Sequence, residues 1–262
     1  MAKSKRVTAG VLLIGDELLS GRTRDINLQE IANFLAPLGI SVAEARIVSD
    51  EQARIVMALN ALRTSCTYVF TTGGIGPTHD DITADAVAAA FGVGIDVRAD
   101  ALAVIEDWYK RSKTPLTESR KRMARIPDGA SLIDNPVTGA PGFQIGNVFV
   151  MAGVPKIARG MMEDIAPRLT GGAVTHAITV SAGGLREGDL ADALRALQAI
   201  NPDVSIGSYP FFLETREGAP KRGTNLVARS TDKTMLHSVG EGLMRIVREA
   251  GGEPTMDDGA KD

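Results

Sequence analysis

The chain has 262 residues, of which 44% are hydrophobic, so it can bury a substantial core in one large or two modest domains. Its 29 basic residues are offset by 32 acidic ones, and a formal net charge of -3 argues against a nucleic-acid backbone as the main partner. The single cysteine, Cys66, excludes an internal disulfide framework and a thiolate metal cage, and we expect a cytoplasmic protein.

The first predicted element is a buried strand from Val7 to Ile14. Its apolar run is only about eight residues, which is too short for a signal or membrane-spanning segment, so we expect no membrane partner. A helix follows, with Asp25 as its N-cap, Gly39 at its end, and an apolar stripe at Leu28, Ile31, Leu35 and Leu38.

The rest of the first half alternates between strand and helix, which is typical of a layered α/β fold. Residues 39–48 predict a second strand. Asp50 is expected to open a helix whose inward face is Ile55, Leu59 and Leu62. A third strand at 67–72, a glycine-rich loop and two helices at about 83–91 and 100–111 follow.

Proline and glycine become frequent after residue 112, around two short strands at about 143–145 and 147–152, and a closing helix covers 156–169. We predict three regions: a first domain of residues 1–170, a smaller α/β domain of residues 171–250, and a disordered polar tail, 251–262. Within the second domain we expect strands at 175–184, 203–210 and 224–230, and helices at 188–200 and 231–250.

The loop Gly73-Gly74-Ile75-Gly76-Pro77 lies between a predicted strand and a predicted helix. Its backbone N–H groups can point at one spot, and the positive end of the helix favours a phosphate there. Asp80 and Asp81 stand beside this cradle, where a bare carboxylate repels phosphate. Either they cap the helix, or a divalent cation lies between them and the phosphate.

Carboxylates also follow the other two predicted strands: Asp16 and Glu17 after the first, Asp50 and Glu51 after the second. If the strands are parallel, their carboxyl ends meet at one edge of the sheet, where ligands bind in open α/β folds. Oxygen ligands from several loops, without a cysteine or histidine cluster, suit Mg²⁺ or a similar ion bridged to substrate phosphates.

Other polar residues allow both a functional and a structural interpretation. His79 could contact a phosphate, although an exposed loop histidine is more often a plain surface residue. For Trp108 and Tyr109, core packing is favoured over stacking on a base. The basic run 120–122 with Arg125 could steer a polyphosphate, but a solvated helix face is the favoured interpretation.

Four segments, in this order and spacing, resemble the molybdopterin-binding (MoaB/Mog-like) domain in its competence/damage-inducible protein A form, which is similar to a domain of eukaryotic FAD synthases. They are GDELLSGRTRDINLQEIANFLAPLGI, VSDEQARI, TTGGIGPTHDDITADAVAAAFG and NPVTGAPGFQIGNVFVMAGVP. The resemblance covers residues 6–170 and extends more loosely to SAGGLREGDLADAL and DVSIGSYP. It implies a three-layer α/β/α sandwich with a mostly parallel sheet, a smaller α/β domain after it, and a homo-oligomer, either dimer or trimer.

Relatives of this form resemble metal-dependent pyrophosphatases that act on ADP-ribose or FAD-like dinucleotides. The resemblance therefore implies a metal-dependent nucleotide pyrophosphatase with Mg²⁺ or a similar cofactor and a nucleotide or pterin ligand. The alternatives are a molybdopterin- or nucleotide-binding protein, and adenylyl transfer in molybdenum cofactor biosynthesis. Full-length competence-type proteins also carry an amidohydrolase domain that deamidates nicotinamide mononucleotide; this chain ends before it, so that activity is not expected.

The resemblance also implies roles for individual residues. The catalytic candidates are Asp81, Asp80 and Asp50, and the metal candidates are Asp80, Asp81 and Asp16. The phosphate- and nucleotide-binding candidates are Gly73, Gly74, Gly76, Pro77, Thr78, Thr83, Gly15, Glu17, Asn27, Gly153 and Pro155. Cofactor-making relatives usually have Thr at the position of Ile75 and Arg at the position of Asp80, and the extra acid suits a metal better than a bare anion.

Overall fold

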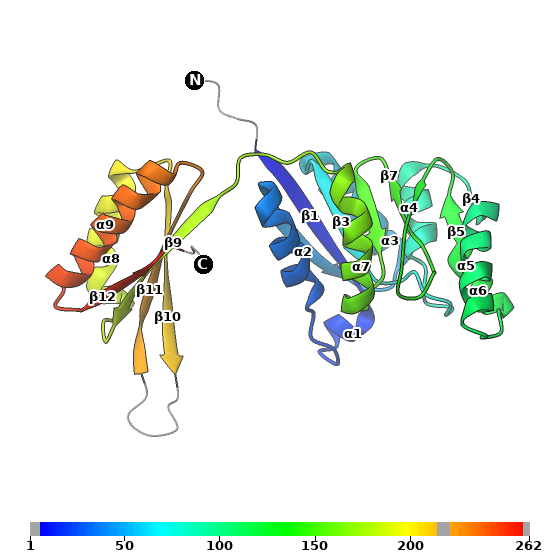
Figure 1. Ribbon diagram of the computed structural model, residues 1–262, viewed down its shortest axis with the longest axis horizontal. Coiled ribbons are helices and arrows are strands. Elements are labelled where there is room, and N and C mark those ends of the chain that lie inside the picture. The colour runs from blue at the N-terminus through cyan, green and yellow to red at the C-terminus, as the bar shows by residue number, and fades with distance from the viewer. Residues whose placement is uncertain (1–5, 214–220, 259–262) are drawn as a thin grey trace. The chain divides into compact units, whose positions relative to one another are not determined.

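The computed structural model describes residues 6–213 and 221–258. The chain divides into two compact units, Met1–Ala173 and Val174–Asp262. In Figure 1 the first unit runs from blue to green and the second from yellow-green to red. The predicted boundary after residue 170 falls just before this division.

A six-stranded sheet of order β2-β1-β3-β8-β7-β6 forms the centre of the first unit. The parallel neighbours are β2 (Ile40–Val48), β1 (Val7–Ile14), β3 (Tyr68–Thr72) and β8 (Val148–Met151). The remaining two strands, β7 (Gly142–Ile145) and β6 (Ser131–Ile133), are antiparallel. The predicted mostly parallel α/β sheet is therefore confirmed.

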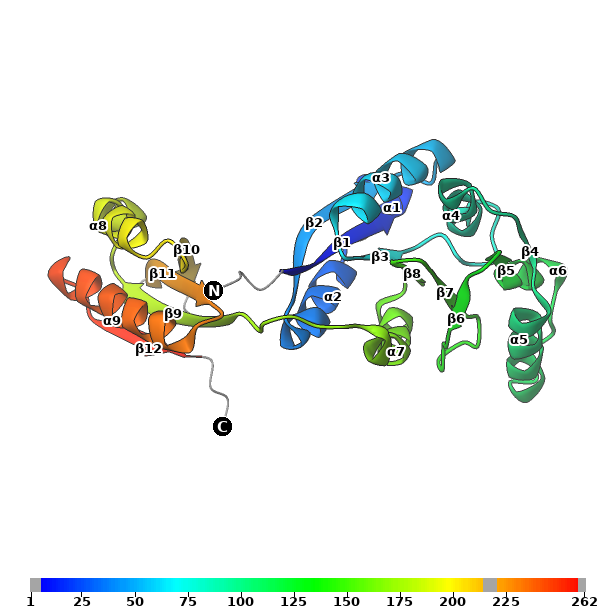
Figure 2. The same ribbon diagram turned by 90° about the horizontal axis from the view of Figure 1, so that it is seen from above.

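Helices cover both faces of this sheet, which explains why β1 is a continuous apolar run rather than an alternating one. Leu12 and Ile14 of β1 belong to the core beneath α3 (Gln52–Ser65) and α4 (Thr83–Phe91). Val11 and Leu13 belong to the opposite core, beneath α2 (Asn27–Leu35) and α7 (Pro155–Ile165). Figure 2 shows these two helix pairs on opposite sides of β1, β3 and β8, so the three-layer sandwich is confirmed.

The remaining elements of the unit include the predicted helix α5 and several shorter elements, some of them in the segment after residue 112 where we expected turns. They are α1 (Asp16–Leu19), η1 (Ala36–Leu38), β4 (Ile95–Val97), α5 (Ala99–Arg111), α6 (Glu118–Lys121), η2 (Arg122–Ala124), β5 (Arg125–Pro127) and η3 (Ala166–Arg168). The β4 and β5 strands form an antiparallel pair. Because each has only three residues, neither shows a periodic pattern in the sequence.

The sequence predicted polar and glycine signals at both ends of α2, although the N-cap position is Ile26 rather than the predicted Asp25. The carboxylate of Asp25 accepts hydrogen bonds from the N–H groups of Asn27 (3.3 Å) and Leu28 (3.0 Å), so it caps the first turn. Gly39 adopts a left-handed conformation with φ of 69° after η1. A helix of this length is thus closed at both ends by residues of the expected type.

The second unit is a four-stranded antiparallel sheet of order β10-β11-β9-β12 with two helices. Its elements are β9 (His176–Gly183), α8 (Glu187–Ile200), β10 (Ser205–Leu213), β11 (Lys221–Ser230), α9 (Lys233–Glu249) and β12 (Pro254–Asp257). Alternate residues Ile178, Val180 and Ala182 of β9 are buried in one core with Leu190 of α8 and Leu243 of α9. The sheet therefore buries one face against the helices. No helix in the described part of the chain is both long and apolar enough to span a membrane.

The predicted disordered tail is wrong for Pro254–Asp257, which form β12 and pair antiparallel with β9. Met256 packs against the core of the second unit, and a Cβ at Gly240 would lie 3.2 Å from its sulfur. Only Pro254 and Met256 carry the apolar alternation of this strand, so the polar composition of the segment conceals it. Residues 259–262 of the predicted tail lie outside the described residues.

Met256→Asp should destabilise the second unit by about 1–3 kcal/mol, because it places a carboxylate against apolar neighbours. Thr255→Asp is the matched control, since Thr255 is exposed on the other face of β12 and should change stability by about 0.5 kcal/mol or less. Urea unfolding of both variants measures the difference. Equal effects would mean that β12 does not cover the core.

Candidate functional site

Four loops meet at the carboxyl edge of the parallel strands, and three of them, those after β1, β2 and β3, were predicted there from the sequence. Gly15 and Asp16 follow β1, Asp50 follows β2, the segment 73–81 follows β3, and the segment 152–155 follows β8. This edge is where open α/β sheets bind ligands. The predicted site residues are therefore brought to one edge, and their individual contacts decide what each can do.

Gly73 seats the glycine loop against two neighbouring strands. With φ of 103°, it lies so close to β1 that a Cβ would stand 2.1 Å from the carbonyl oxygen of Ile14. Its N–H donates to the carbonyl oxygen of Met151 at the end of β8 (3.2 Å). A Cβ at Gly153 would in turn lie 3.2 Å from the Gly73 Cα. Only glycine fits this crossing, so the loop position is fixed by backbone contacts.

Thr83 supports the loop from below. Its side chain is fully buried, and its hydroxyl donates to the carbonyl oxygen of Gly73 (2.8 Å). Its N–H donates to the carbonyl oxygen of Gly74 (2.9 Å), and a Cβ at Gly74 would lie 2.2 Å from the Thr83 hydroxyl. The hydroxyl that we expected on a phosphate is thus used to hold the loop.

Asp81 closes the outer part of the same loop. Its Oδ2 accepts from the N–H (2.7 Å) and from the hydroxyl (2.5 Å) of Thr78, and a Cβ at Gly76 would lie 2.6 Å from this oxygen. Ile82, not an aspartate, precedes the first residue of α4. Asp81 therefore caps a local turn rather than the helix, and one of its oxygens is already occupied.

Asp80 differs from Asp81 in its surroundings. Its side chain is largely exposed, and Nδ1 of the fully exposed His79 lies 4.0 Å from its Oδ1. Hydrogen bonding from Thr78, whose hydroxyl also serves Asp81, lowers the pKa of the Asp80 carboxyl below its ordinary value. Asp80 is therefore an ionised, accessible carboxylate at the rim of the loop.

Asp50 does not open α3, contrary to the sequence prediction. Glu51 occupies the N-cap position, and its side chain makes no capping hydrogen bond. Oδ2 of Asp50 instead accepts from the N–H of Asp16 (2.9 Å), joining the loops after β1 and β2. Burial raises the pKa of the Asp50 carboxyl, and the charges of Asp16, Glu17 and Asp80 raise it further, while the Asp16 N–H opposes the shift. Three other carboxylates thus act on Asp50.

Gly15, in the loop after β1, is closely packed on two sides. The N–H of Gly15 donates to the carbonyl oxygen of Val48 (3.1 Å), and a Cβ at Gly15 would lie 2.5 Å from Oε2 of Glu17. The Glu17 carboxylate therefore folds back over Gly15. Asp16 is exposed beside it, at the first residue of α1.

Asn27 links α2 to the loop after β8. The side chain is only 5% exposed, and its Nδ2 donates to the carbonyl oxygen of Gly153 (2.7 Å) and lies 3.5 Å from the Thr72 hydroxyl. Its Oδ1 is buried without a hydrogen-bond partner among the described residues. Asn27 therefore positions Gly153, just before Pro155 begins α7, and offers a free acceptor at the sheet edge.

The carboxylates form an open set rather than a finished metal cage. Within residues 6–213 and 221–258, no group of three or more His, Cys, Asp and Glu side chains is placed to hold a metal ion. The charges of Asp16 and Asp80 nevertheless both act on Asp50. Mg²⁺ usually takes one or two carboxylates together with substrate phosphates. The donor set fits an ion whose coordination a phosphate completes.

Comparison with known families identifies both units. Residues 10–171 match the model of the probable molybdopterin binding domain. The chain belongs to this family. Residues 174–251 match the middle domain of FAD synthase, so the molybdopterin-binding domain is followed by a second domain of known type.

Similar proteins agree with this assignment. A CinA-like protein from Citrifermentans bemidjiense is 37% identical over 70% of this chain and 46% of its own length, and one from Gemmatimonas aurantiaca is 34% identical over 85% and 54%. A protein from Aeropyrum pernix is 32% identical over 95% of this chain and 97% of its own length. The solved structure of CinA from Thermoplasma acidophilum, described as of unknown function, matches with a TM-score of 0.57 at 34% identity, over 62% of this chain and 96% of that one.

This molybdopterin-binding domain with its second domain is thus of the CinA N-terminal type, as the four sequence motifs indicated. The chain spans about half the length of the CinA-like relatives. The sequence interpretation missed a cavity beside the glycine loop, lined by Arg122 and Arg125. The charge of these arginines was visible in the sequence, but their position on the cavity depends on the short elements η2 and β5.

Thr83→Val should lower the free energy of unfolding of the first unit by about 1–3 kcal/mol, because it leaves the Gly73 carbonyl oxygen without its side-chain donor. Thr83→Ser keeps the hydroxyl and loses one methyl group, so its cost should be about 1 kcal/mol or less. Urea unfolding distinguishes them. If both variants are equally destabilised, the hydroxyl does not hold the loop.

Asp50→Asn should raise the melting temperature at neutral pH but not in acid. A carboxyl with a raised folded-state pKa gives stability that is fully present below its unfolded pKa of 3.8 and is lost as the pH rises through the folded value. The amide keeps an acceptor for the Asp16 N–H and carries no charge. The gain should vanish near about pH 3 and grow above about pH 5.

Thermal unfolding across this pH range measures the effect. Asp107→Asn, on the exposed face of α5, removes one negative charge away from the sheet edge and serves as the control. A gain for Asp50→Asn that does not change with pH, or one that the control shares, would contradict the mutual repulsion of the site carboxylates.

Proposed function

We propose that the chain is a metal-dependent hydrolase of the diphosphate linkage in nucleotides of the ADP-ribose or FAD type. The observation that carries the proposal is the meeting of Asp16, Asp50 and Asp80 at the edge where the glycine loop presents its backbone N–H groups. Carboxylates whose charges act on Asp50 beside an anion cradle would be stabilised together by a cation and a phosphate.

The roles follow from what each residue already contacts. The amides of Gly74 and Gly76 and the positive end of α4 would hold one phosphate. Asp16 and Asp80, both exposed, would hold the cation, which when bound stabilises charge on the phosphoryl oxygens. Asp81 and Thr83 keep the loop in shape rather than touching the phosphate.

Asp50 is the proposed general base. Its carboxylate is held at the sheet edge by the Asp16 N–H, where it can accept a proton from an attacking water. The water oxygen forms a bond to one phosphorus, the bond from that phosphorus to the bridging oxygen breaks, and the proton passes to Asp50. The bridging oxygen leaves with the other phosphate, so two phosphate monoesters result, one of which is AMP when the substrate contains adenosine diphosphate.

The second candidate is binding of molybdopterin or a nucleotide without turnover. It is favoured by the open carboxylate set, which holds no group of three metal-ligating side chains in the described part of the chain. The match to the probable molybdopterin binding domain supports a pterin as ligand in this case. The homo-oligomer that the family resemblance implies stays a prediction under both candidates.

The activity assay incubates the purified protein with ADP-ribose, FAD, or ATP plus molybdopterin, with and without Mg²⁺, Mn²⁺ or Co²⁺, and follows release of AMP or diphosphate. We expect metal-dependent AMP from a dinucleotide. Asp50→Asn should reduce kcat by roughly 100-fold or more, since general base catalysis typically contributes that much. Asp107→Asn should leave kcat unchanged.

We expect Asp50→Asn to have a melting temperature at least as high as that of the wild type. A loss of turnover in this variant therefore cannot be explained by unfolding. Full turnover in Asp50→Asn would remove Asp50 from the role of base. If no combination of substrate and metal gives AMP, while calorimetry shows micromolar binding of a pterin or nucleotide, the hydrolase proposal is rejected in favour of the binding protein.

A further inference from the structure

A small cavity adjoins the glycine loop on the side away from Asp50. The loop residues 74–76, the first turn of α4 and the segment 122–126 enclose it, with a volume of about 20 Å³. That volume admits one group of the size of a water molecule or a phosphoryl oxygen, but no ring. Whatever part of a ligand reaches this cavity is therefore small.

The basic residues around the cavity are not equivalent. Arg120 stacks over the Tyr109 ring, 5.0 Å from its centroid, and donates to the carbonyl oxygen of Pro115. Lys121 pairs with Glu118 at 2.7 Å. Both are thus engaged in local structure at the end of α5, and neither lines the cavity.

Arg122 and Arg125 do line the cavity. Among the described residues, no carboxylate oxygen lies within 4.0 Å of the exposed Arg122 side chain. Arg125 binds Asp85 of the first turn of α4 through Nη2, while its Nε is buried and has no partner in the described part of the chain. The wall thus carries one guanidinium, that of Arg122, without an acidic partner, and a second, that of Arg125, which is paired with Asp85.

Two carboxylates also lie in the cavity wall. Asp85 is paired with Arg125, while Asp81 accepts two hydrogen bonds from the uncharged Thr78, which do not neutralise a carboxylate. The N-terminal end of α4, a helix of nine residues, adds positive potential at the same place. The mouth of the cavity therefore presents the Arg122 guanidinium and the N-terminal end of α4 beside the glycine loop.

We infer that Arg122 and Arg125 bind the second phosphate of a diphosphate whose first phosphate lies on the amides of Gly74 and Gly76. The inference rests on the proposed function and names its substrate class: the site selects a diphosphate over a monophosphate. Guanidinium groups match phosphate oxygens in pairs, and Arg122 has no acidic partner among the described residues. The nucleoside or pterin ring lies outside this cavity.

Calorimetry with inorganic diphosphate and with inorganic phosphate tests the inference without requiring turnover. The Kd of the wild type for diphosphate should be lower than for phosphate. In Arg122→Gln, loss of a charge-assisted contact should raise the Kd for diphosphate roughly tenfold and that for phosphate less than about twofold. Arg125→Lys, which retains a cation for Asp85, should also weaken diphosphate selectively.

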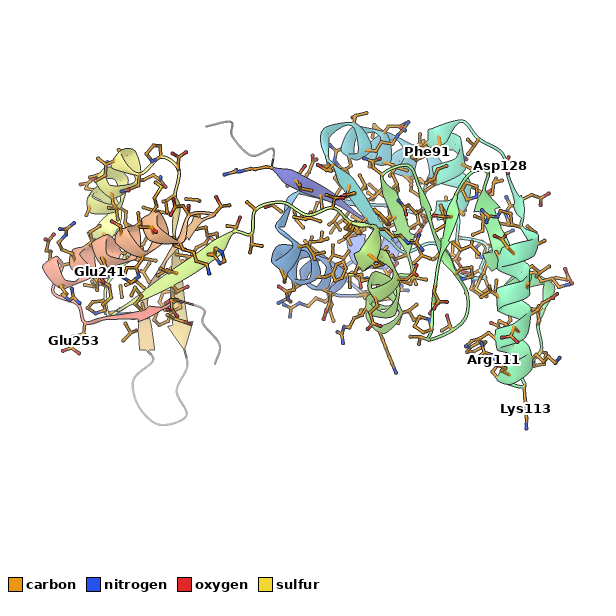
Figure 3. All side chains as sticks on the ribbon, turned by 45° about the horizontal axis from the view of Figure 1, so that its top comes forward. Phe91, Arg111, Lys113, Asp128, Glu241 and Glu253 are labelled. Carbon is orange, nitrogen blue, oxygen red and sulfur yellow. The ribbon has the colours of Figure 1, made fainter. Side chains whose placement is uncertain are left out.

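Arg111→Gln is the matched control. Arg111 lies at the end of α5, points into solvent in Figure 3 and pairs only with Asp107 of its own helix, at 2.9 Å, among the described residues. An equal loss in this variant would mean general electrostatic attraction, and unchanged diphosphate binding in Arg122→Gln would overturn the subsite. If Arg122→Gln selectively loses affinity for diphosphate but the protein releases no AMP, the subsite is retained and hydrolysis is rejected. If the protein releases AMP and Arg122→Gln leaves the KM unchanged, hydrolysis is retained and the subsite is rejected.

Discussion

The close backbone crossing at Gly73 is the constraint on which the rest of the site depends. At this residue the end of β3 lies against the carbonyl oxygen of Ile14 on β1 and the chain at Gly153 after β8. A side chain at Gly73 would clash with Ile14 and push the ends of β3 and β1 apart. The parallel order of the strands brings the loops that follow them, and their polar residues, to one edge, and the crossing at Gly73 fixes how closely the loops after β3 and β1 approach.

Most of the polar side chains around this crossing hold the loop in its conformation. Thr83 donates to Gly73, Asn27 donates to Gly153, and Asp81 closes the turn through Thr78. These side chains hold the loop, in which the N–H groups of Gly74 and Gly76 donate to no acceptor among the described residues. In the proposed function these two main-chain donors would bind an anion without rearrangement, which keeps the cost of binding low.

Local and periodic signals made the fold predictable. The buried run of β1, the Asp25 cap and the Gly39 ending are properties of neighbouring residues, and the sheet edge followed from the parallel order of the strands. The role of Asp50 was not predictable in this way, because its partner is the N–H of Asp16, distant in sequence. The strand at Met256 was missed for a related reason, since its burial depends on α9 and β9.

Within the proposed function, the charges divide the site into two halves. On one side of the glycine loop, burial and the charges of Asp16, Glu17 and Asp80 disfavour an ionised Asp50, so this half favours a cation. On the other side, Arg125 is paired with Asp85, and Arg122 has no acidic partner among the described residues, so that half offers a guanidinium to an anion. A metal-bound monophosphate satisfies only the first half. A diphosphate reaches both, and its linkage then lies over the loop, between the base and the guanidinium groups.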